Sequence, residues 1–119
     1  MQYMLLIYED ERIYGPDRES PAARERRAQH VAYRHELGAT WLAGSGLKDS
    51  SAATTIRTAA GKQTIHDGPF AESREQLAGY YLIDVPDLDA AIAVAKKVPL
   101  SQNGAVEVRP LLVPLPVSG

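Results

Sequence analysis

The side chains best suited to acid–base chemistry are one carboxylate and two histidines from different parts of the chain. Asp67 precedes Gly68-Pro69, so the proline restricts its backbone, and the carboxylate is either a general base or a turn residue that caps neighbouring amides. His35 falls on the predicted inward side of a helix, where it is either a core residue or the partner of Asp67. His30, five residues earlier, points elsewhere around that helix, so the two histidines cannot chelate a metal together. We predict acid–base catalysis by Asp67 with His35 or His30.

Three further side chains are candidates for ligand binding. Phe70, the only phenylalanine, either walls an apolar pocket beside Asp67 or belongs to the core. Glu72 is near enough in sequence to line the same cleft, or it stands on a solvated turn. Arg109 projects from the same strand face as Glu107, so its guanidinium either binds an anionic ligand or forms a structural salt bridge.

The sequence gives little support for metal binding or for catalysis by a nucleophilic serine. The chain has no cysteine and only three scattered histidines, so we expect no metal site, and we predict no cofactor. The acidic run Glu9-Asp10-Glu11 is typical of a solvated loop. Gly44-Ser45-Gly46 lacks the wider glycine spacing of a nucleophile elbow, and we interpret it as a flexible connection.

Composition limits the class of protein. The chain has 119 residues, of which 45% are hydrophobic and 24% charged, which is ordinary for one globular domain. Its formal net charge of −2 gives no electrostatic support for nucleic-acid binding. The apolar run near the N-terminus is too short to span a membrane and lacks the flanks of an export signal, so we expect a cytoplasmic protein that does not bind membranes.

Hydrophobic patterning and capping residues predict the elements that position these side chains. A first helix is predicted over 21–37, because Ser20-Pro21 offers an N-cap and neither glycine nor proline recurs before Gly38. Asp87 caps a second predicted helix that ends before Pro99. Helical periodicity predicts that Tyr33 points outward. The inward stripe that it predicts for the first helix consists of Arg24, Ala28, Val31, His35 and Gly38. Strands are predicted over 3–8, 79–85 and 105–109, with a hairpin over 53–58 and 63–66 and a short helical turn over 73–76.

The order strand, helix, hairpin, strand, helix, strand predicts an α+β fold of the ferredoxin-like sandwich type. Two helices would cover one face of an antiparallel sheet. We expect a single domain over 1–119 that ends in an extended Pro-rich tail over 110–119.

The hydrophobic pattern of the first strand predicts that the chain forms a dimer. Met4 and Leu6 face one side of the sheet while Leu5 and Ile7 face the other, so both faces are apolar. Two helices cover only one face, and we therefore predict a homodimer formed by sheet-to-sheet packing. The alternative cover for the second face is the segment 41–47 or the Pro-rich tail.

Four segments in this order resemble a known family. They are MQYMLLIYEDE at the N-terminus, DGPFAESREQLAGYYLIDV from Asp67, DLDAAIAVAKKVP and VEVRPL. Together they are similar to the DGPF-domain proteins, a branch of the YCII-related family. The resemblance implies a ferredoxin-like fold assembled as a dimeric α/β barrel in bacteria, sometimes associated with extracytoplasmic-function sigma factors.

The resemblance implies less about activity. Some YCII-like proteins are thought to carry a His–Asp pair in a cleft, and one relative acts as a dehydrochlorinase on a chlorinated hydroxyquinol. By analogy Asp67 would be the carboxylate, but the helix position of the family's histidine falls on Arg27. Two hypotheses follow: a small acid–base enzyme for an aromatic or quinol-like substrate, or a non-catalytic ligand-sensing or interaction module.

Overall fold

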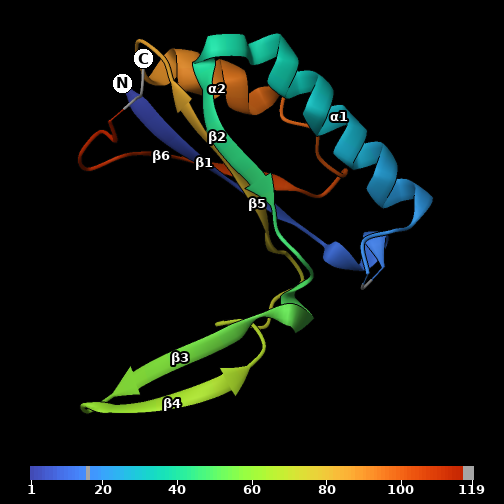
Figure 1. Ribbon diagram of the computed structural model, residues 1–119, viewed down its shortest axis with the longest axis vertical. Helices are drawn as coiled ribbons and strands as arrows, with labels where there is room; N and C mark the ends of the chain where they lie inside the picture. The colour runs from blue at the N-terminus through green and yellow to red at the C-terminus, as the bar shows by residue number, and fades with distance from the viewer. Residues whose placement is uncertain (16, 117–119) are drawn as a thin grey trace.

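Four strands form an open antiparallel sheet that carries both α-helices on one face (Figure 1). This computed structural model describes residues 1–15 and 17–116. Across the sheet the order is β2 (Trp41–Gly46), β5 (Gln76–Asp84), β1 (Gln2–Glu9) and β6 (Ala105–Pro110), and every neighbouring pair is antiparallel. The order places β1 and β5 in the middle and confirms the predicted ferredoxin-like α+β sandwich.

The two long helices form where the sequence predicts them. Helix α1 (Pro21–Leu37) begins after Ser20, whose side chain accepts a hydrogen bond from the Ala23 amide. Helix α2 (Leu88–Lys96) begins after Asp87, which caps the Ala90 amide in the same way. Three short 3₁₀ helices, η1 (Glu11–Tyr14), η2 (Gly38–Thr40) and η3 (Ser50–Ala52), connect the larger elements. None of the helices within residues 1–15 and 17–116 is long and apolar enough to cross a membrane.

The core lies between the helices and the sheet. Odd-numbered residues of β1 point toward the helices, and Leu5 pairs in register with Tyr81 of β5. Leu5 and Ile83 are both 0% exposed, so they form the centre of this layer. The buried cluster consists of Tyr3, Leu5, Ile7, Tyr33, Tyr81, Ile83, Val85, Ala91 and Val98.

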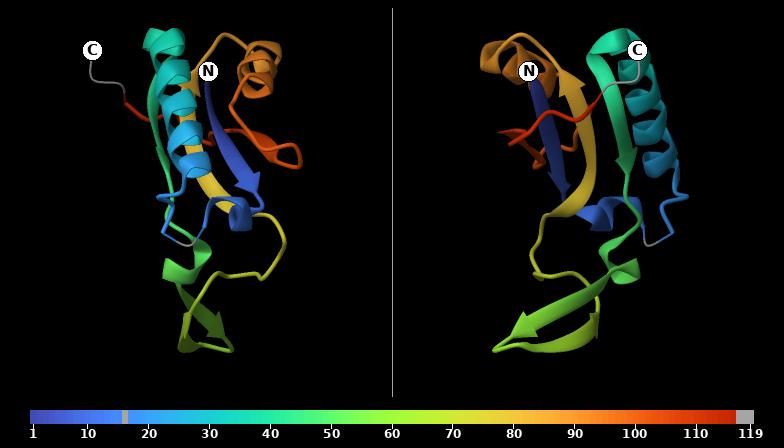
Figure 2. Two further views of the ribbon diagram at one scale, coloured as in Figure 1. Left: turned by 90° about the vertical axis from the view of Figure 1, so that its right-hand side faces the viewer. Right: turned by 60° about the vertical axis from the view of Figure 1, so that its left-hand side comes forward.

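The predicted hairpin forms, but it stands apart from the main sheet. Strands β3 (Thr54–Ala59) and β4 (Lys62–Asp67) pair only with each other, and nearly all of their residues are exposed. Figure 2 shows the hairpin extending beyond one end of the sheet, and Figure 1 shows it turning away from the side that carries the helices. The hairpin is therefore not part of the central sheet.

The fourth strand of the sheet is instead β2, in the segment that we interpreted as a flexible connection. Its glycines permit close packing against β5 rather than flexibility. A Cβ atom at Gly44 would lie 2.8 Å from the carbonyl oxygen of Tyr80, and one at Gly79 would lie 2.8 Å from that of Ser45. Glycine is therefore required where these two backbones approach each other.

The segment before β5 and the Pro-rich tail are both irregular. The helical turn predicted over 73–76 is absent: this part of the chain is irregular and leads into β5. The Pro-rich tail crosses the start of β1, where Gln2 exchanges hydrogen bonds with the backbone of Leu115 through both ends of its side-chain amide. Leu112 in the same tail is 99% exposed, so this strap is apolar on its outer side. Residues 117–119 of the predicted tail lie outside the described residues.

Candidate functional site

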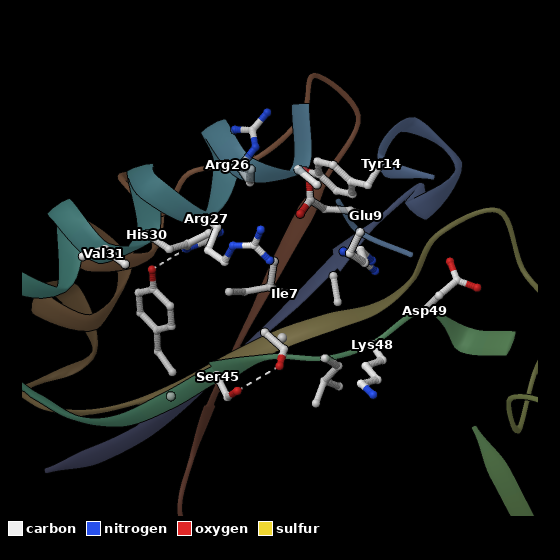
Figure 3. A pocket seen from close by; sticks show the side chains of 18 of the residues that line it. Ile7, Glu9, Tyr14, Arg26, Arg27, His30, Val31, Ser45, Lys48 and Asp49 are labelled. Atoms are coloured by element: carbon white, nitrogen blue, oxygen red, sulfur yellow. Dashed lines mark hydrogen bonds between the residues drawn. The ribbon is translucent and has the colours of Figure 1, made fainter. Parts of the chain in front are cut away.

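A cleft of about 660 Å³ lies between α1 and the β2–β5 side of the sheet (Figure 3). Its floor is formed by β1 and β5, including Glu9 and Tyr81, and one wall is formed by α1. The chain between β2 and η3 supplies the opposite rim, where Lys48 and Asp49 lie. Figure 3 shows His30 of α1 toward one end of the cleft, and Glu9 with Tyr14 toward the other.

The side of α1 that faces the sheet differs from the predicted stripe. The inward positions are Ala23, Arg26, His30, Tyr33 and Leu37, spaced three or four residues apart, while all five residues of the predicted stripe are exposed. The inward side chains include long polar residues that hydrophobic patterning does not select. Tyr33 donates to the Val94 carbonyl at 2.7 Å, and Arg26 Nη1 donates to the Leu100 carbonyl at 2.7 Å. These bonds tie α1 to α2 and to the loop that follows it.

Because the inward side of α1 differs from the predicted one, His30 is the helix histidine that lines the cleft, and His35 is exposed. His30 Nδ1 lies 2.5 Å from the Tyr81 hydroxyl, with the two rings edge-on at 76°. Burial lowers the pKa of His30, Glu9 partly opposes this shift, and the positive charge of Arg26 adds to it. Burial raises the pKa of Tyr81 to about 12. Both side chains are therefore mainly neutral at pH 7, and the second ring nitrogen of His30 makes no hydrogen bond with a described residue.

Glu9 is a buried carboxylate at the other end of the cleft. It is 2% exposed and accepts hydrogen bonds from the Tyr14 hydroxyl at 2.6 Å and the Ser101 amide at 3.0 Å. Burial, together with the hydrogen bond and charge of Glu9, raises the pKa of Tyr14 to about 12. The prediction that Glu9-Asp10-Glu11 forms a solvated loop was wrong: Glu11 is also buried and accepts a hydrogen bond from the Ser50 amide.

The structure does not bring Asp67 and the helix histidines together within one chain. Asp67 ends β4 in the projecting hairpin, where it is exposed. Among the described residues, no hydrogen bond or ion pair joins it to His30 or His35. A pairing of Asp67 with either histidine stays a prediction. In this arrangement the two groups would have to come from different copies of the chain.

The predicted ligand-binding residues lie away from the main cleft. Phe70 is 71% exposed, packs against the Arg57 guanidinium at 4.9 Å, and lines a separate hollow of about 410 Å³ together with Glu72. The interpretation of Phe70 as a core residue was therefore wrong. Arg109 forms an ion pair with Glu107 on β6 and is largely exposed, which is the structural alternative we considered. In the described parts of the chain, no three His, Asp or Glu side chains gather to hold a metal ion.

Comparisons with known proteins identify the family. A profile of the YCII-related domain matches residues 1–113. An uncharacterised protein of Rhizobium meliloti (strain 1021) is 37% identical over 114 residues, which cover 93% of this chain and 92% of the relative. The chain belongs to the YCII-related family.

Proposed function

We propose that the cleft beneath α1 binds a small hydroxylated aromatic molecule and that His30 exchanges a proton with its hydroxyl group. The observation that carries this proposal is the position of the His30 imidazole, which is held by the Tyr81 hydroxyl and lines a cleft large enough for a small molecule. Burial lowers the pKa of His30, which favours the neutral imidazole. Aromatic walls support the choice of ligand: Tyr14, Trp41 and Tyr81 all line the cleft.

The proposed proton transfer uses both ring nitrogens of His30. A hydroxyl group both donates and accepts, so Tyr81 holds either neutral tautomer of the imidazole. In the tautomer whose Nδ1–H donates to Tyr81, Nε2 has a free lone pair that accepts the ligand's hydroxyl proton. The products are an imidazolium and an aromatic oxyanion, and the negative charge of Glu9 favours the imidazolium.

The test uses 4-nitrophenol, whose ionised form absorbs visible light and whose neutral form does not. Binding to the wild-type protein near neutral pH is expected to increase the phenolate absorbance saturably. The variant His30→Gln should bind the probe without this increase, and His35→Gln, which alters an exposed histidine of the same helix, should behave as wild type. Binding without ionisation would support a non-catalytic ligand-sensing module. Failure of the wild type to bind would refute the proposal.

We further propose that the functional unit is a homodimer joined through the helix-free sheet face. Met4 and Leu6 are only partly covered on that face, where the described chain places no helix. The hairpin turns toward the same side (Figure 1) and exposes Ile56 and Ile65, which lie opposite each other in register. An isolated two-stranded ribbon is marginally stable in water, so contact with a second copy would stabilise it.

Sedimentation at micromolar concentration tests the dimer. We expect a dimer for wild type, dissociation for Leu6→Asp, and no change for Thr64→Asp on the other face of the hairpin. A wild-type protein that sediments as a monomer would contradict the assembly. A cytoplasmic location and an association with sigma factors remain predictions from the sequence.

A further inference from the structure

Arg18 has a largely enclosed guanidinium that makes no hydrogen bond with any described residue. Its Nε and Nη2 atoms are buried without a partner, and its side chain is only 18% exposed. The guanidinium forms an ion pair with Glu11, whose carboxylate oxygen lies 3.7 Å from Nη2, which is too far for a hydrogen bond. The guanidinium packs over the ring of Tyr14 at 5.1 Å. The charged group is therefore held in place while its donors are unused.

This arrangement is unfavourable in the absence of a ligand. Buried donors of a charged group cost free energy when they lose water without gaining an acceptor. The backbone of Arg18 adds to this cost, because its φ of +58° lies in the left-handed region that a side chain with a Cβ atom rarely adopts. Unused donors and local strain together indicate a position shaped for binding rather than for stability.

Further positive groups converge on the same end of the cleft. Arg26 also lies beside Tyr14, and its Nε is buried without a partner among the described residues, although its Nη1 is bonded to Leu100. Both arginines line the cleft. The first turn of α1, whose Ala23 lines the cleft as well, carries no acidic residue to offset the positive end of the helix dipole.

Two buried carboxylates lie nearby, and neither accepts a hydrogen bond from these arginines. Glu11 forms a long ion pair with Arg18, at 3.7 Å. Glu9 accepts hydrogen bonds from Tyr14 and Ser101, and no ion pair joins it to either arginine in the described part of the chain. Glu11 therefore balances part of the charge of Arg18, but Nε and Nη2 have no hydrogen-bond acceptor among residues 1–15 and 17–116, and a ligand could supply one. A planar guanidinium fork matches the two oxygens of a carboxylate.

We propose that Arg18, supported by Arg26, binds the carboxylate of the ligand, so that the cleft is specific for aromatic hydroxy acids. This inference rests on the proposed function, in which His30 receives the hydroxyl group. The ligand would lie along the cleft with its hydroxyl group toward His30 and its carboxylate toward Arg18. Figure 3 shows His30 and Tyr14 toward opposite ends of the cleft, and Arg18 packs over the Tyr14 ring.

The experiment compares 4-hydroxybenzoate with 4-hydroxybenzamide, a neutral molecule of nearly the same shape, by titration calorimetry. Wild type is expected to bind the acid about ten to a hundred times more tightly, as a charge-assisted pair predicts. Arg18→Met should lose most of this preference while retaining affinity for the amide, which also shows that the variant is folded. Arg18→Lys should keep part of the preference. Arg12→Met, which changes an exposed arginine outside the cleft, should keep all of it.

The outcomes distinguish a failure of the carboxylate site from a failure of the proposed aromatic-binding function. If wild type binds both compounds equally, or if Arg18→Met keeps the full preference for the acid, the carboxylate site is refuted while the aromatic cleft stands. If wild type binds neither compound, the proposed function itself fails. Should Arg18→Met not fold, a crystal structure of wild type with 4-hydroxybenzoate decides: a carboxylate bonded to Arg18 supports the inference, and one placed elsewhere overturns it.

Discussion

Replacing Tyr14 with phenylalanine tests whether the hydrogen bond to Glu9 holds the floor of the cleft together. The Tyr14 hydroxyl lies 2.6 Å from a carboxylate that is 2% exposed, so removing the hydroxyl leaves a buried charged group with one hydrogen-bond donor fewer. A hydrogen bond to a charged group contributes about 1.5–3 kcal/mol, and the burial of Glu9 favours the upper half of that range. We therefore expect Tyr14→Phe to lower the free energy of unfolding by about 2–3 kcal/mol in urea denaturation, with an unchanged denaturant dependence.

The matched control for this variant is Tyr8→Phe. Tyr8 lies on the same strand but on the helix-free face, and its hydroxyl bonds to none of the described residues. Removing that hydroxyl should change the free energy of unfolding by less than about 0.5 kcal/mol. Equal effects of Tyr14→Phe and Tyr8→Phe would refute the reasoning, because they would mean that the buried carboxylate does not depend on its hydroxyl donor.

Three other predictions concern the cleft and the core. Glu9→Gln should lower the pKa of His30 further, since the charge of Glu9 raises it, and an unchanged value in an NMR titration of the His30 ring would contradict the assignment. The folded-state pKa of His30 is lowered, so its contribution to stability is complete above its unfolded pKa of about 6.5 and is lost as the pH falls toward the folded value. His30→Gln should therefore flatten the decline of unfolding free energy below about pH 6.5, and a slope equal to that of wild type would disprove this. Leu5→Ala should cost about 2–5 kcal/mol in urea denaturation because Leu5 is 0% exposed, and a loss under about 1 kcal/mol would show a plastic core.

The sequence predicts most of the secondary structure because local signals determine it. Ser20 and Asp87 cap the two helices as expected, and the ends of α1 coincide with the predicted ones. The segment Trp41–Gly46 was missed as a strand because its glycines resemble those of a connection. They serve instead to bring two backbones together, which is a property of the neighbouring strand and not of the segment itself.

The candidate site was harder to predict because its residues are amphipathic. Hydrophobic periodicity selected the side of α1 that carries Ala28 and Val31. Arg26, His30 and Tyr33 face inward instead, because their polar ends form hydrogen bonds there. One signal was available for Glu9: it continues the odd-numbered series of buried residues in β1. Arg18 had no such signal, since its burial depends on the path of the loop before α1.

The most direct test of the central claim is ¹⁵N NMR of the histidine rings during a titration with 4-nitrophenol. The chain has only three histidines, so each ring can be assigned with single substitutions. We predict that the His30 ring shifts from the neutral to the protonated pattern as the probe saturates the cleft, while His35 and His66 do not respond. A His30 ring that stays unchanged at saturation, or a response confined to His66 in the hairpin, would contradict the account.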